Sequence, residues 1–509
     1  MEIPFKLDRV GLLSGIVAIA LATIGAPARA QGPAIGPPDG SSPPCTIRRN
    51  PSAPGAPANV DVLLLHGATV SVAVVVNRDG IEIVRNTIDD QTDQVVCSKV
   101  QSVTWEEFWS NTETQDIVRE AAEMKKISPT EPPSSGLAGR VLPAALTGDS
   151  IYIAAIADST IGSDRALFVA AAKVGNNPAR LNWNLFRIQL IPITGAPFCA
   201  PSADAFISDP HVGVSPAGRL FVSFDSSEGS TTTGSILDID TKSLLRGGPP
   251  QMQCFMGTEL AGLAPPDVRD DNENAYFVGV RNLAAVKRYK LKVGAHVARD
   301  RLIATPDINI PTFAFNPAAV QPNGKHLYAG GFDFARPSIQ LGTALWNIHQ
   351  IGDDGGHAKL RLYKFGVTAT DPKMTMTLAT LPDQSDDLIA PSLEIDGADA
   401  FVSFTRTIAA DPVNGEATLM MARGPNGSSA GWTSSVLAAS TGQFSKNTLG
   451  QPCDTFEFAG CLYGPNSATA FDPINNVVWG FGEIITNGRL GSGKGSEVNW
   501  LVKGVAVPR

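Results

Sequence analysis

A single pattern recurs along most of this chain: a proline, a short apolar strand, a turn rich in Gly, Asp or Asn, and then a strongly apolar strand. Six copies recur at intervals of 51 to 74 residues, and their prolines are Pro143, Pro210, Pro266, Pro317, Pro391 and Pro465. Most copies are followed by two further apolar segments. A lone four-stranded sheet cannot bury both of its faces, whereas a ring of such sheets can. The repeat therefore predicts an all-β protein, a six-bladed β-propeller over residues 137–509.

The segment before the repeats, residues 60–136, is predicted to close or flank this ring. Residues 60–76 are mostly apolar and β-branched, and the Asn-Arg-Asp-Gly sequence at 77–80 suits a hairpin turn. The sixth copy ends after its third strand, so we expect residues 60–76 to supply its outer strand. The alternative is a seven-bladed ring in which residues 60–100 form a degenerate blade.

One short helical insertion is predicted after these strands. Thr104 and Glu107 have the spacing of a capping box, which places the helix start at Thr104. An interrupted apolar stripe continues through Lys126. We expect its aromatic residues to pack on the side of the ring.

The N-terminus has the pattern of an export signal. Lys6 and Arg9 precede an apolar run over residues 10–24, and small residues flank Arg29. The run is too short to span a bilayer, and no later segment reaches that length. We therefore predict a signal peptide over residues 1–30 and no membrane span in a mature protein that is secreted or periplasmic. Residues 31–59 hold eight prolines and are predicted to form a tether.

The net charge and the cysteine and histidine spacing limit which classes of partner and cofactor the chain is expected to bind. A net charge of −9, without a basic cluster, excludes a nucleic-acid partner. The cysteines have no CxxC spacing and the histidines have no HExxH spacing, so neither a metal nor a cofactor is predicted. An oxidising compartment favours disulfides between nearest neighbours in sequence, within the set Cys45, Cys97, Cys199, Cys254, Cys453 and Cys461.

Charged side chains recur where first strands begin and second strands end, which is one face of a propeller. Among them are Asp158, Asp209, His211, Arg281, Arg406 and Glu483. Fixed carboxylates and guanidiniums at a channel mouth suit a small polar ligand, anionic or hydroxylated. The simpler interpretation is that these are solvated loop ends in which Arg and Asp of neighbouring blades pair.

Two segments resemble the sialidases and related Asp-box (BNR-repeat) hydrolases. The first is Arg140-Val-Leu-Pro143, which is similar to the Arg-Ile-Pro opening of that family with one extra residue. The second begins at Tyr463 and ends at Glu483, similar to the late Tyr segment. Two Asp-box-like turns, residues 175–183 and 424–432, lack the aspartate.

This resemblance implies a retaining exo-glycosidase on a six-bladed ring. Arg140, Arg281 and Arg406 would clamp a substrate carboxylate. Tyr463 would be the nucleophile beside a carboxylate, with Glu483 as a further catalytic candidate. Asp158 or Asp164 would be the acid/base.

The sequence alone favours binding of a glycan or another small polar ligand at the channel mouth, with His211 and Asp209 also contacting it. A sialidase-like glycoside hydrolase is the first alternative. A non-catalytic scaffold for a partner protein is the second, because a fold does not determine an activity.

Overall fold

A computed structural model describes much of the chain. The described residues are 28–30, 45–50, 61–66, 71–77, 80–89, 94–104, 108, 116–118, 123–127, 150–159, 165–173, 182–190, 199–202, 205–207, 210–270, 272, 274–314, 318–328, 334, 338–378, 385–412, 415–443, 461–462, 467–472, 476–487 and 498–508.

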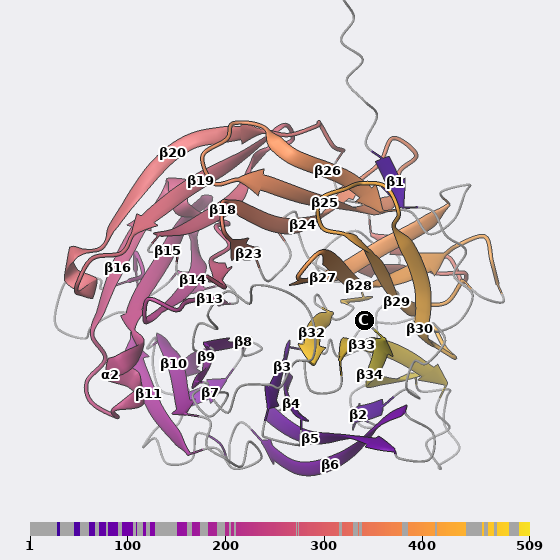
Figure 1. The fold of residues 1–509 in the computed structure, drawn as a ribbon, viewed down its shortest axis with the longest axis horizontal. Coiled ribbons are helices and arrows are strands. Elements are labelled where there is room, and N and C mark those ends of the chain that lie inside the picture. The colour runs from indigo at the N-terminus through magenta and orange to yellow at the C-terminus, as the bar shows by residue number, and fades with distance from the viewer. Residues whose placement is uncertain are drawn as a thin grey trace, which may run out of the picture.

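The fold is nearly all β, and its sheets lie around a common centre, as the blades of a propeller do (Figure 1). The main building block is an antiparallel unit of consecutive strands. Four such units, within the described residues, take all four strands from one stretch of chain. They are β3 (Asp61–His66), β4 (Ser71–Asn77), β5 (Gly80–Asp89) and β6 (Gln94–Thr104); β13 (His211–Ser215), β14 (Arg219–Glu228), β15 (Thr231–Asp240) and β16 (Met252–Gly257); β23 (Ser338–Leu341), β24 (Ala344–Gly352), β25 (Ala358–Gly366) and β26 (Pro372–Leu378); and β27 (Asp386–Asp396), β28 (Asp399–Ile408), β29 (Thr418–Pro425) and β30 (Thr433–Ala439).

Other units are assembled differently. In the sheet of β9, β10 and β11, two short strands, β7 and β8, both pair with β9. Strands β18, β19 and β20 form a separate sheet. The C-terminal strands β32 to β34 gain an outer strand, β2, from near the N-terminus. The bounds are β2 (Cys45–Asn50), β7 (Asp116–Val118), β8 (Glu123–Ile127), β9 (Ser150–Ser159), β10 (Arg165–Lys173), β11 (Trp183–Gln189), β18 (Asn274–Asn282), β19 (Ala285–Lys292), β20 (Arg301–Asn309), β32 (Ala468–Asp472), β33 (Val477–Asn487) and β34 (Val498–Pro508).

Three first strands pair with one another in parallel near the centre. The strand β17 (Pro266–Val268) lies between β13 and β23, and it joins their units into one continuous sheet. The close approach of the β13 and β17 backbones requires a glycine at position 213. A Cβ at that position would lie 2.4 Å from the carbonyl oxygen of Pro266. Two short strands extend the same sheet, β1 (Ala28–Ala30) along β26 and β12 (Phe206–Ile207) along β14.

Apolar side chains fill the spaces between adjacent units. Leu167 of β10 and Val222 of β14 belong to one buried cluster. Phe221 of β14 and Phe277 of β18 meet edge to face, with ring centroids 5.4 Å apart. The unit β13 to β16 therefore buries both of its faces, which a lone sheet cannot do.

Helical structure in the described residues is short. It comprises Phe108, α2 (Thr241–Leu245), η2 (Thr258–Leu260) and η3 (Val297–Arg299). Within the ranges given above, no helix is long and apolar enough to cross a membrane.

The helix predicted between Thr104 and Lys126 is confirmed only at Phe108, whose backbone is helical, and its predicted continuation to Lys126 is wrong. Residues 116–118 and 123–127 form β7 and β8, which both pair antiparallel with β9. The apolar stripe toward Lys126 was a local signal, and the requirement of the apolar strand β9 for a partner outweighed it. Phe108, inside the predicted helix, packs edge to face on Trp183 of β11 at 5.4 Å.

Two further expectations about the repeat differ from the structure. The copy at Pro317 forms a small hairpin of β21 (Ala319–Val320) and β22 (His326–Tyr328), which pairs with β31 (Cys461–Leu462). The unit expected there begins instead with β23. The outer strand of the last unit is β2, which lies within the predicted tether, and residues 61–104 form their own sheet.

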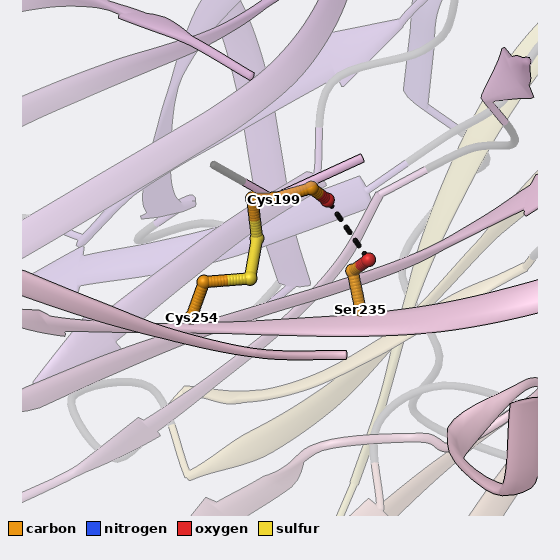
Figure 2. The surroundings of a disulfide bond; sticks show 3 residues. All are labelled: Cys199, Ser235 and Cys254. Atoms are coloured by element: carbon orange, nitrogen blue, oxygen red, sulfur yellow. Dashed lines mark hydrogen bonds between the residues drawn. A yellow bond between two sulfur atoms is a disulfide. The ribbon is translucent and has the colours of Figure 1, made fainter. Parts of the chain in front are cut away.

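One predicted disulfide is confirmed. Cys199 and Cys254 are bonded, with an S–S distance of 2.02 Å, and they tie the segment before β12 to β16 (Figure 2). The Ser235 hydroxyl donates to the Cys199 carbonyl oxygen at 2.9 Å. The side chains of the other four cysteines lie outside the described residues.

Candidate functional site

Five of the predicted site residues cannot be placed as side chains. Arg140, Asp164, Asp209 and Tyr463 lie outside the described residues. Asp158 lies in β9, where its backbone is opposite Arg165 and Ile117, and its side chain is not described. The proposed nucleophile and acid/base therefore stay predictions.

The surroundings of Arg281 favour the interpretation that it is a solvated arginine paired with an aspartate, and not a ligand-binding residue. Its Nε donates to Asp307 at 2.9 Å, and both side chains are more than a third exposed. Asp307 belongs to β20, the outermost strand of the same sheet. This exposed ion pair occupies the guanidinium that the predicted clamp would need.

Two other predicted residues lie where first and second strands meet. We call this the proximal end of a unit: the end at which its first strand begins and its second strand finishes. His211 begins β13 opposite Ser223 and is half-buried. Glu483 lies in β33 and is buried.

The register places Arg406 and Glu483 at the proximal ends of adjacent units. The Ser403 hydroxyl of β28 donates to the carbonyl oxygen of Ala468, and Ala468 is opposite Phe481 of β33. Both β28 and β33 are second strands and run toward the proximal end. Arg406 is three residues beyond Ser403, and Glu483 is two beyond Phe481, so both lie past this contact at the same end.

Arg406 has an unusual environment for a guanidinium. It is 6% exposed, and its Nε is buried with no hydrogen-bond partner among the residues that the structure describes. Burial lowers its pKa, while the nearby carboxylates of Asp386 and Asp411 act in the opposite direction. A buried donor without an acceptor costs free energy, so this position requires an explanation.

Other buried arginines have their donors satisfied. Arg288 donates to Thr305 at 2.8 Å and to the carbonyl oxygens of Gly366 and Ala369 at 2.9 and 2.8 Å. Arg361 donates to the carbonyl oxygen of Pro311 at 2.6 Å. These guanidiniums hold neighbouring segments together, and Arg406 makes no comparable bond through its Nε.

Asp386, opposite this end of β28, forms a buried ion pair. Lys359 Nζ lies 2.5 Å from Asp386 Oδ1 and also contacts the Asp386 carbonyl oxygen. Both side chains are 3% exposed or less. Lys359 therefore supplies a direct counterion to the Asp386 carboxylate, which also acts electrostatically on Arg406.

Asp387 accepts several hydrogen bonds next to this pair. It accepts from the backbone of Ala358 and Val320, at 2.8 and 2.9 Å, and Nδ1 of His357 lies 3.2 Å away. Burial raises its pKa, and these contacts only partly offset that effect. The arrangement fixes the Asp387 carboxyl in one orientation.

The backbone of β27 is strained at this end. Ala390 has φ 52°, which is uncommon for a residue other than glycine, and lies at a bulge. Its N–H donates to Gln350 Oε1 at 3.3 Å, and its carbonyl oxygen accepts from Ser467 at 3.2 Å. Such strain persists only where surrounding contacts enforce it, and it is frequent at binding sites.

The sequence analysis missed His357, Lys359, Asp386 and Asp387. The repeat places the start of this first strand at Pro391, whereas β27 begins at Asp386. The signal that was available is the Asp-Asp doublet immediately before the apolar run over residues 388–395. No group of three or more His, Cys, Asp or Glu side chains that could hold a metal occurs in the described ranges.

Comparisons with known proteins give limited likenesses. No family model matches this chain, and no curated protein matches it. The matching solved structures include an α-L-arabinofuranosidase from Fusarium graminearum with an iminosugar inhibitor, 9% identical over 92% of this chain and 98% of its own, with a TM-score of 0.35.

An α-L-arabinanase from Penicillium chrysogenum, solved with arabinobiose, is 9% identical over 91% of this chain and 98% of its own, with a TM-score of 0.34. A GH43 endo-arabinanase from Bacillus licheniformis is 14% identical over 53% of this chain and 89% of its own, with a TM-score of 0.26. At these values the likenesses assign no activity to this chain, and the sialidase resemblance stays a prediction.

Proposed function

We propose that this protein binds a hydroxylated polar ligand, a glycan, at the proximal end around Arg406. The observation that carries the proposal is the buried Nε of Arg406, which has no acceptor among the described residues. A buried Nε–H without an acceptor is costly, and a ligand oxygen would remove that cost on binding. Sites of this kind combine a few fixed polar groups with a rigid scaffold.

The charges near Arg406 favour hydroxyl groups over a strongly anionic ligand. The carboxyl groups of Asp386 and Asp411 act on Arg406, and Lys359 is paired with Asp386, so the positive charges here already have negative partners. Carboxylates accept hydrogen bonds from sugar hydroxyls, and a guanidinium donates to hydroxyl or ring oxygens. A glycan matches both kinds of group.

For the architecture we propose a seven-bladed ring carried by an exported protein. Support for seven blades comes from the four-stranded sheet β3 to β6, which takes every strand from residues 61–104. Support for export comes from the N-terminal pattern of residues 1–30 and from the Cys199–Cys254 disulfide.

Sialidase-like hydrolysis is the second candidate function. It is favoured by Glu483, a buried carboxyl at the same end as Arg406. The exposed ion pair of Arg281 with Asp307 argues against the three-arginine clamp.

The direct test is a glycan array with purified mature protein, followed by calorimetric titration of the best ligand. Arg406→Gln should weaken binding at least tenfold, because it removes the charged donor. Arg423→Gln is the matched control: this arginine lies in the same unit but in an exposed pair with Asp399, and binding should be unchanged. Binding that survives Arg406→Gln would contradict the site.

Hydrolysis is tested separately with a panel of fluorogenic aryl glycosides, including N-acetylneuraminate. Release that disappears in Tyr463→Phe would support the sialidase-like alternative. Array binding without any release would support binding alone.

A further inference from the structure

A second group of buried charges lies away from the proposed ligand site, where the η3 turn meets the unit β13 to β16. Arg219, at the start of β14, is surrounded by three carboxyl groups. Its Nε lies 2.8 Å from Asp300 Oδ2 and 3.7 Å from Asp238 Oδ1, and its Nη1 lies 3.7 Å from Asp240. One positive charge cannot balance three ionised carboxyl groups.

Burial makes this imbalance severe. The side chains of Asp238 and Asp300 are 0% exposed, whereas Asp240 is 18% exposed and accepts from the backbone N–H of Ser243 at the start of α2. Two buried carboxylates near one another cannot both ionise at ordinary cost, so one of them holds a proton.

The hydrogen bonds indicate which carboxyl group is neutral. Asp300 accepts from Arg219 at 2.8 Å and from the Gly294 backbone N–H at 2.5 Å, so both of its oxygens already have donors. Neither oxygen of Asp238 has a donor among the described residues, and Gln253 Oε1, across the strand pair, is also buried without one. A proton on Asp238 would supply the missing donor.

We propose that Asp238 holds a proton beside Asp300, and that this proton and Arg219 form a pH-sensitive latch which holds the η3 turn against β14 and β15. Arg219 also donates to the Gly294 carbonyl oxygen at 3.1 Å, so both ends of the turn are bound. The other charged groups nearby, Lys242 of α2 and His296 and Arg299 of the turn, are exposed and do not neutralise the pair.

The direction of the pH effect follows from the proton count. Burial, and then the Asp300 carboxyl, raise the pKa of Asp238 to about 9, far above its value in an unfolded chain. Between those two values the folded protein holds more protons than the unfolded chain. The latch therefore contributes fully below about pH 4, and its contribution is lost as the pH rises toward 9.

The test is urea unfolding of the full chain, with its disulfides intact, from pH 6 to pH 9. The unfolding equilibrium constant of the wild type should rise with pH by up to about tenfold per unit, the limit for one proton. Asp238→Asn, which keeps a neutral side chain of the same shape, should lose that slope and become more stable than the wild type at pH 9. Asp399→Asn, in an exposed pair, should keep the wild-type slope.

Two further measurements keep the proposal testable if a variant does not fold. Infrared or carbon-13 spectra of the wild type should contain a buried protonated carboxyl group at pH 7. Trypsin cleavage after Arg299, normalised to a small peptide substrate, should accelerate severalfold between pH 7 and pH 9. The latch is refuted if no protonated carboxyl is found, or if Asp238→Asn retains the wild-type slope.

Discussion

Arg219 and Arg406 are both buried arginines at the ends of second strands, and their surroundings are opposite. Arg219 begins β14 and contacts Asp300, Asp238 and the Gly294 carbonyl oxygen. Arg406 lies two residues before the end of β28, and its Nε has no acceptor among the described residues. Burial is the largest effect on Arg219, but the hydrogen bond to Asp300 and the carboxyl groups of Asp300, Asp238 and Asp240 together outweigh it and raise the pKa. Burial dominates at Arg406 and lowers its pKa.

The difference separates a structural arginine from a candidate binding arginine. Removing one member of a complete buried network leaves its partners unpaired, which destabilises the fold. Removing an arginine that has an unpaired N–H also removes the free-energy cost of burying that donor. This gain offsets part of the packing energy that is lost with the side chain. Folding stability and ligand affinity should therefore respond in opposite ways at the two positions.

The largest effect is expected for Arg219→Met. It leaves the Asp300 carboxylate buried without a counterion and should lower the free energy of unfolding by about 3 to 5 kcal/mol at pH 7. Urea unfolding measures this. Arg299→Met removes an exposed arginine of the adjoining turn and should change stability by less than about 0.5 kcal/mol. Equal effects of the two variants would contradict the network.

A smaller loss is expected for Lys359→Met. Asp386 loses its direct counterion, but Arg406 is close enough to interact with that carboxylate. We expect a cost on the order of 2 kcal/mol, less than for Arg219→Met. In an Arg406→Met background the same change should cost more, which a double-mutant cycle detects. Additive effects would show that Arg406 and Asp386 are not coupled.

Arg406→Met alone should change the free energy of unfolding by less than about 1 kcal/mol, because its Nε has no acceptor, within the described part of the chain, to leave unpaired. Ligand binding should be lost in the same variant. A loss of stability as large as that of Arg219→Met would assign Arg406 a structural role and would break the comparison.

The smallest effect is expected for Arg281→Met. Its ion pair with Asp307 is exposed, and such pairs contribute little. We expect a change within about 0.5 kcal/mol in unfolding and no change in ligand affinity. A clear loss of affinity would instead restore Arg281 to the ligand site, as the sequence resemblance implied.

The parts of the fold that the sequence predicted are those set by neighbouring residues. The hairpin of β13 and β14 follows Pro210, and its turn contains Gly218 at φ 85°, a conformation that suits glycine. The turn at residues 77–80 likewise joins β4 to β5. Alternation of apolar residues over a few positions was sufficient in these segments.

The predicted strand positions were wrong where segments far apart in the sequence compete for the same position in the fold. Pro317 begins the same local pattern as Pro210, but the unit at that position starts at β23. Pro391 lies inside β27 beside a bulge, so the strand begins five residues earlier and brings Asp386 and Asp387 into the site. The bulge depends on Gln350 and Ser467, which no local pattern reveals.

By itself the sequence determined that this chain is built from repeated antiparallel strands, because strand periodicity, turn glycines and apolar content are local properties. Tertiary structure decided which strand closes each unit and which charges are balanced. Arg219, Arg281 and Arg406 cannot be told apart as residue types, and only the packing of other strands sets their burial and their partners. Ion pairing depends on distance and on exclusion of water, and both are properties of the folded chain.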